Sequence, residues 1–62
     1  MMYPFVMVVI AVFGPGLGEY DTREEHIYYG TMAECERNMK WKEDELMSDP
    51  EFRGASITCK SR

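Results

Sequence analysis

Hydrophobic residues are concentrated near the start of the chain, where residues 5–13 (FVMVVIAVF) are all apolar. Valine and isoleucine fill five of these positions, a phenylalanine stands at each end, and a turn rich in glycine and proline follows at residues 14–18. β-Branched and aromatic residues closed by such a turn are typical of a β-strand. Because no polar residue alternates with the apolar ones, we expect both faces of this strand to be apolar.

A short apolar run near the start of a chain also raises the question of a secretion signal or a membrane anchor. Residues 1–4 contain no lysine or arginine, which a signal peptide carries before its apolar core, and no small-residue cleavage site follows. A membrane-spanning helix needs about 20 apolar residues, whereas this run ends before Gly14. We therefore expect a strand and no membrane partner.

The second predicted strand covers residues 25–30 (EHIYYG), after a long loop that holds glycine, proline and acidic residues. Strand geometry places Ile27 and Tyr29 on one face and His26 and Tyr28 on the other. The two strands therefore form a hairpin.

A helix is predicted to follow, because residues 31–34 (TMAE) fit the capping box, in which the threonine and glutamate side chains accept from exposed N–H groups. Apolar residues then recur at helical spacing on one side. These residues are Met32, Cys35, Met39, Leu46 and Met47. The helix should stop at Asp49, since the residue before a proline disfavours helical geometry.

A last strand is predicted at residues 54–60 (GASITCK), with Ala55, Ile57 and Cys59 on one face. The order β-β-α-β, with a right-handed crossover through the helix, places the third strand antiparallel to the first on its free edge. We therefore expect a single α+β domain over residues 1–62: a three-stranded antiparallel sheet of order 2-1-3 with one helix on one face.

This topology brings the two cysteines together, because the start of the helix and the end of the last strand lie at the same level. Cys35 and Cys59 are then neighbours, although they are far apart in the sequence. In an oxidising compartment we expect a disulfide worth about 3 kcal/mol. The lack of a signal peptide favours the cytosolic alternative, two small buried thiols.

Length and charge narrow the function classes. A chain of 62 residues lies near the lower limit for independent folding, which leaves little stability for an elaborate active site. Its net charge of −4 repels phosphate backbones, and its basic residues are scattered among acids, so direct nucleic-acid binding is not expected.

Candidate chemistry is sparse. His26 has acidic neighbours but no nucleophile placed by a recognised motif, so we interpret it as a partly exposed strand histidine. His26, Cys35 and Cys59 lack the paired spacing of zinc ligands. The G-x-G-x-G at residues 14–18 matches neither phosphate-binding fingerprint. We therefore expect no catalytic residue, no cofactor and no metal.

Two surfaces are candidates for binding. A single helix covers one face of the sheet, so one row of the first strand points away from it. That row is either Val6, Val8, Ile10 and Val12, or Phe5, Met7, Val9, Ala11 and Phe13. Flanked by His26, Tyr28, Ser56 and Thr58, it would form an apolar strip with a polar rim, unless the loop or the N-terminus folds over it.

The second surface is the outer side of the helix, where Trp41 lies opposite the apolar stripe, near Asp44 and Glu45. Tryptophan is over-represented in binding hot spots. The alternatives are that Trp41 caps the edge of the core, and that the acidic residues form an ordinary solvated helix face.

The whole layout resembles that of many short, mostly uncharacterised accessory proteins of tailed bacteriophages. The shared features are an apolar first strand, a second strand, a helix started by Thr or Ser with an early Cys (here TMAEC), and a last strand ending in Cys (here SITC). The longer loop GPGLGEYDTREE and Trp41 depart from that pattern. The resemblance implies a phage protein that acts in the host cytoplasm by binding a host enzyme.

We therefore expect a non-enzymatic protein-binding module, in particular a phage-encoded inhibitor or modulator of a host enzyme complex such as RNA polymerase, a nuclease or a defence system. Its partner would be a host or viral protein. The expected contact residues are Val6, Val8, Ile10, Val12, Tyr28, Trp41, Asp44 and Glu45. The alternative is a self-assembling structural or virion-associated protein, a homo-oligomer joined through the apolar sheet face.

Overall fold

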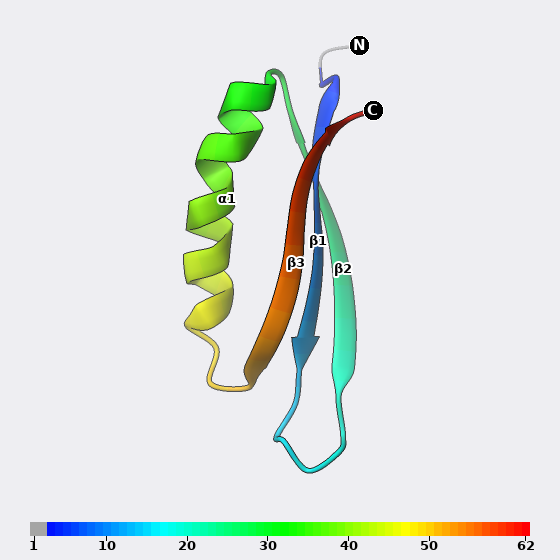
Figure 1. Cartoon of the computed structure of the whole chain (residues 1–62), viewed down its shortest axis with the longest axis vertical. Helices are drawn as coiled ribbons and strands as arrows, with labels where there is room; N and C mark the ends of the chain where they lie inside the picture. Colours follow the sequence, from blue (N-terminus) through cyan, green and yellow to red (C-terminus); the bar gives the residue numbers. More distant parts are fainter. Residues whose placement is uncertain (1–2) are drawn as a thin grey trace.

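The predicted β-β-α-β order is confirmed by a computed structural model, which describes residues 3–62 (Figure 1). The elements are β1 (Phe5–Phe13), β2 (Asp21–Tyr29), α1 (Met32–Met47) and β3 (Phe52–Ser61). β1 pairs antiparallel with both neighbours, in the sheet order β2-β1-β3. The fold is therefore α+β, with the most apolar strand at the centre of the sheet, as the sequence predicts.

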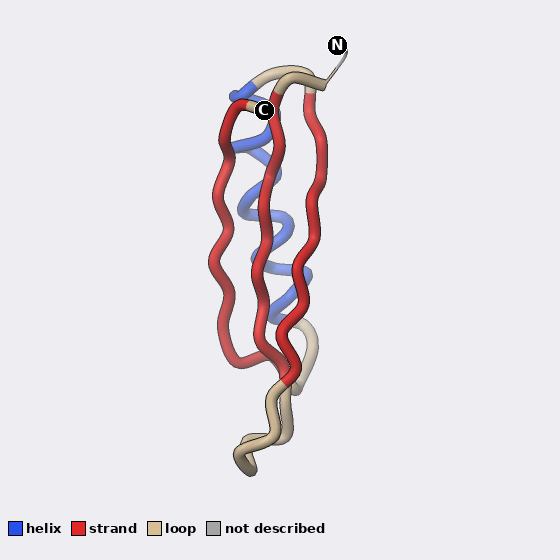
Figure 2. Tube along the Cα trace, turned by 90° about the vertical axis from the view of Figure 1, so that its right-hand side faces the viewer, coloured by secondary structure: helices blue, strands red, loops and turns tan. Residues whose placement is uncertain are grey.

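The molecule is a thin, elongated slab that measures 43 × 18 × 12 Å. Seen along the direction that Figure 2 gives, α1 lies behind the three strands and runs along most of their length. The loop that joins β1 to β2 extends beyond the end of the sheet. One face of the sheet is thus covered by α1, and neither α1 nor this loop covers the other.

The cross-strand register shows which row of β1 faces the helix. Met7 pairs with Ile27 on β2 and Cys59 on β3, and Met7 and Val9 are fully buried against Cys35 of α1. The buried members of this row are Met7, Val9, Ala11 and Phe13. Since side chains alternate along a strand, the other row points away from the helix. That row is Val6, Val8, Ile10 and Val12.

The start of α1 follows the predicted capping box with one change. The Thr31 hydroxyl accepts a 3.1 Å hydrogen bond from the Glu34 N–H, as expected. The Glu34 carboxylate, however, accepts from the N–H of Gly30 at 3.3 Å rather than from that of Thr31. The helix ends at Met47, two residues before Asp49, whose side chain accepts from the Glu51 N–H in the turn that leads to β3.

The bounds of two strands differ from the prediction. β2 begins at Asp21, four residues before Glu25, and β3 extends from Phe52 to Ser61. The cause is the length of β1, whose backbone groups need partners along the whole strand, so that Phe13 pairs with Asp21. Charged residues therefore join the sheet at its edge, where their side chains reach solvent.

A disulfide joins Cys35 and Cys59, with their Cα atoms 6.1 Å apart. The predicted proximity of the two residues is confirmed, and the expectation of two free thiols is wrong for this structure. The bond ties the first turns of α1 to the end of β3. Disulfides are rare in the cytosol, so the bond and the expected cytoplasmic location point in opposite directions; the location stays a prediction.

Candidate protein-binding surfaces

The face of the sheet that points away from α1, which we call the open face, centres on Val6, Val8, Ile10 and Val12 of β1. Whether the N-terminus folds over it falls on residues 1–2, which lie outside the described residues. Its flanks match the predicted rim, because Val8 pairs with His26 and Thr58, and Ile10 pairs with Ser56 on β3. Ile10 is 41% exposed although it lies on the central strand. The loop does not cover this row, since it lies beyond the sheet and its Leu17 is 84% exposed (Figure 1).

One end of the open face is closed by Arg62. Its N–H donates to the Pro4 carbonyl at 2.8 Å, and its guanidinium lies 4.7 Å from the centre of the Tyr28 ring on the opposite edge strand. The side chain therefore crosses the start of β1, and Val6 in this region is buried. Tyr28 itself remains 45% exposed, so its ring borders the exposed part of the row.

The middle of the open face carries one titratable pair. The imidazole Nε2 of His26 and the Glu24 carboxylate lie 2.7 Å apart, and both side chains are about half exposed. His26 is therefore a partly exposed strand histidine that contacts a carboxylate on its own strand.

Trp41 lies on the outer side of α1, where it is 50% exposed, as its helical position predicts. The two acids predicted to act with it already have partners: Asp44 accepts from Lys40 at 3.2 Å, and Glu45 accepts from Lys42 at 2.7 Å. The hydrogen bond with Asp44 raises the pKa of Lys40. The charges beside Trp41 are thus largely compensated within the chain.

The predicted contact residues fall into two groups on opposite sides of the molecule. Val6, Val8, Ile10, Val12 and Tyr28 share the open face, whereas Trp41, Asp44 and Glu45 belong to α1, on the other side of the sheet (Figure 2). One flat partner surface cannot contact both groups at once.

Lys42 is a structural residue that the sequence prediction missed. It is only 5% exposed, and its ammonium group contacts Glu25 of β2 at 2.6 Å and Glu45 at 2.7 Å. Burial acts to lower the pKa of Lys42, but the hydrogen bonds and charges of Glu25 and Glu45 outweigh it, so the pKa lies above its ordinary value. Position 42 lies between Met39 and Leu46 on the sheet-facing stripe, and this spacing could have identified it.

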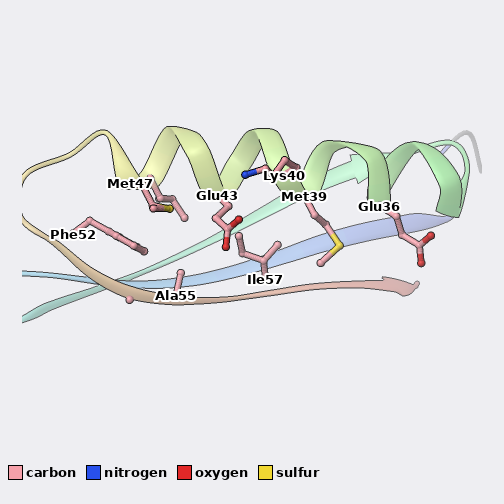
Figure 3. A pocket seen from close by; sticks show the side chains of 10 residues that line it. Glu36, Met39, Lys40, Glu43, Met47, Phe52, Ala55 and Ile57 are labelled. Atoms are coloured by element: carbon pink, nitrogen blue, oxygen red, sulfur yellow. The ribbon is translucent and has the colours of Figure 1, made fainter.

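The sequence also gave no sign of a groove between α1 and β3. Its volume is about 580 Å³. Figure 3 shows side chains of α1, among them Met39, Met47 and Glu43, and side chains of β3, among them Phe52 and Ile57, around this space. Met47, expected in the apolar core stripe, is instead 61% exposed at the rim.

The described residues contain neither a cluster of possible metal ligands nor a helix that could span a membrane. Within 3–62, no group of three or more His, Cys, Asp or Glu side chains could hold a metal ion. α1, the helix of this part of the chain, is too short and too polar to cross a membrane.

Comparison with known proteins found no matching protein family, no similar curated protein and no similar solved structure.

Proposed function

We propose that this chain is a non-enzymatic protein-binding module whose open face contacts a partner protein. The observation that carries the proposal is the exposure of Ile10, within the apolar row of the central strand, and of Tyr28 beside that row. In a sheet of this size, apolar residues on the central strand are ordinarily covered by a second layer. An apolar strip with a polar rim is the kind of surface that marks interaction sites.

The size of the open face favours a larger partner over a second copy of the chain. β1 has nine residues, so the face is about 30 Å long and, across three strands, about 14 Å wide. Each partner would bury roughly 400 Å² of this flat surface, whereas a stable interface buries about 800 Å² per partner. A larger protein can also contact the strand edges and the Arg62 end, which two stacked sheets cannot do.

Trp41 is a secondary element of this proposal. Because it lies on the opposite side from the open face, a partner that binds the open face reaches Trp41 only by wrapping around an edge of the sheet. Asp44 and Glu45 add little charge there, since each already pairs with a lysine.

We further propose that the module is a phage accessory protein and that its partner is a host enzyme complex, such as RNA polymerase, a nuclease or a defence system. This proposal rests on the β-β-α-β layout and the cysteine pair, the features that carry the resemblance to phage accessory proteins. It includes a location in the host cytoplasm.

The test uses a double variant, Val8→Thr with Ile10→Thr, which makes the open face polar and keeps the β-branched shape of both residues. Leu17→Thr is the matched control, because it makes an equally polar change on the exposed loop. A protein captured from a bacterial lysate is identified, purified and titrated with wild type and both variants. We expect binding to weaken about tenfold or more in the double variant and to stay unchanged in the control.

Amide NMR shifts measured in the same titration locate the contact. Shifts along β1 and at Tyr28 are expected. Equal affinity of all three proteins, or shifts confined to α1, would show that the open face is not the binding surface.

A further inference from the structure

The two edge strands of the sheet differ in charge. β2 is protected against pairing with another strand by titratable side chains along much of its length. These are Asp21, Arg23, Glu24, Glu25 and His26. β3 has no charged residue from Gly54 to Cys59, and its register with β1 is regular there, since the shift in pairing lies beside Val12 and Phe13. Within residues 3–62, no strand pairs with the outer edge of β3.

The groove between α1 and β3 borders this uncharged edge. Its β3 wall includes Phe52, Ala55 and Ile57 (Figure 3). The apolar part of its α1 wall is formed by Met39, Leu46 and Met47. A strand added to the outer edge of β3 would point every second side chain toward the helix side of the sheet, into this space.

The volume of the groove fits such a strand. A cavity of about 150 Å³ holds one benzene-sized group, so about 580 Å³ accommodates between three and four large apolar side chains. A segment paired with the six residues from Gly54 to Cys59 presents about three side chains on one face. The segment that pairs with the edge of β3 and the segment that fills the groove with its side chains therefore have about the same length.

We propose that β3 and this groove bind an extended segment of a partner protein by strand addition, with apolar side chains in the groove and a lysine or arginine facing Glu36 and Glu43. The proposal rests on the proposed protein-binding function and assigns it a second surface. In this recognition mode, backbone hydrogen bonds supply affinity and alternate side chains supply specificity.

Charge identifies the occupant as a basic segment of another protein. Glu36 and Glu43 line the groove, both are exposed, and neither forms a salt bridge within residues 3–62. Lys40, the basic residue of the lining, already pairs with Asp44. A second copy added at the same edge would bring the same two acids on its own α1 toward this groove, and like charges would oppose it.

The test uses a fluorescent synthetic peptide in which leucine and threonine alternate, with a lysine at each end of the leucine row. A matched peptide has glutamate in place of both lysines. Two further versions carry backbone N-methyl groups on alternate residues, so that each lacks the N–H donors of one edge only. We expect the lysine peptide to bind, the glutamate peptide to bind at least about tenfold more weakly, and one N-methylated version to lose binding.

Variants of the protein locate the peptide. Ala55→Arg places a long side chain in the groove, and Ser56→Arg makes the same change one residue later, on the open face. Glu36→Lys with Glu43→Lys reverses the rim charge, and Glu19→Lys is the control for charge reversal on the exposed loop. Ala55→Arg and the Glu36/Glu43 pair should weaken binding by about tenfold, while both controls bind as wild type does.

The result that would overturn the proposal is peptide binding that survives both N-methylations, or that Ala55→Arg leaves unchanged. A dimer of the chain that Ala55→Arg abolishes would show that a second copy occupies the edge instead. These outcomes are separate from the open-face test. If wild type does not bind the peptide but binds its partner through Val8 and Ile10, only the strand-addition proposal fails. If wild type binds the peptide as predicted but partner binding does not depend on Val8 and Ile10, only the open-face proposal fails.

Discussion

The Lys42 ammonium on α1 and the Glu25 carboxylate on β2 form a 2.6 Å ion pair. Lys42 is buried while Glu25 is half exposed, so the lysine stem crosses the apolar layer and its charged end reaches the margin of the sheet. Glu45 completes the site at 2.7 Å. This pair connects α1 to the edge strand β2, and the disulfide connects it to the opposite edge strand β3, so the helix is tied to both edges of the sheet.

Lys42→Ala should destabilise the fold by about 1–3 kcal/mol, because it removes packed methylene groups and leaves two carboxylates together without their cation. Lys42→Met keeps most of the packing and should cost less. Urea unfolding of the three proteins measures the difference. Equal stability of Lys42→Ala and wild type would show that the buried lysine contributes nothing to the fold.

Alkaline pH should weaken the fold through Lys42 and Tyr29. The pKa of Tyr29 is raised by burial and then by the charge of Glu34, and that of Lys42 is raised by its two carboxylates against the effect of burial. A group whose pKa is higher in the folded state stabilises the fold fully below its unfolded pKa and loses this contribution as the pH rises through the folded value. The ordinary values are 10.0 for tyrosine and 10.5 for lysine.

Unfolding free energy measured from neutral pH to above pH 11 should therefore fall only above about pH 10. In Lys42→Met with Tyr29→Phe, the fall in this window should be smaller than in wild type. An identical alkaline slope in both proteins would contradict the assignment of the fall to these two groups.

Gly14→Ala should destabilise the fold, because an added Cβ would lie 2.3 Å from the Glu19 carbonyl oxygen. The Gly14 N–H also donates to the Glu51 carbonyl at 2.8 Å, so the backbone cannot easily shift away. We expect a loss of about 1–3 kcal/mol, typical of overpacking. Gly54→Ala is the control, since its Cβ would meet no atom within 4 Å. Thermal unfolding should separate the two variants by several degrees, with Gly54→Ala close to wild type.

Reduction of the disulfide should lower the unfolding free energy by about 3.5 kcal/mol, the value that the loop-entropy model gives for a sequence separation of 24 residues. The measurement is urea unfolding with and without a thiol reductant. Cys35→Ala with Cys59→Ala serves as the control, and its stability should not respond to the reductant. A wild type equally stable in both conditions would mean that packing alone holds α1 to β3.

The fold could be predicted from the sequence because the local sequence patterns of its strands and its helix are all compatible with one topology. The apolar run at 5–13, the alternation around Ile27 and the cap at Thr31 each specified one element, and the antiparallel order then placed Cys35 beside Cys59. The start of β2 was missed because Asp21 and the charged residues after it have low strand propensity. Pairing with a long central strand overrides that local preference.

The surfaces were harder to predict, because they depend on how the elements pack. Two apolar rows of β1 were equally suitable for the core, and only the packing of Met7 against Cys35 shows which one faces α1. Lys42 was considered only as one of the basic residues scattered among acids, although its position lies on the sheet-facing stripe and its side chain is buried. The groove has no sequence signal, since its walls come from α1 and β3 together.

We propose that the open face remains uncovered in the isolated chain and is available to a different protein. Sedimentation velocity from about 1 μM to about 1 mM, on wild type and on Val8→Thr with Ile10→Thr, tests this proposal. We predict a monomer at all concentrations for both proteins. A wild-type oligomer that the double variant abolishes would contradict it, because the apolar row would then be buried against a second copy of the chain.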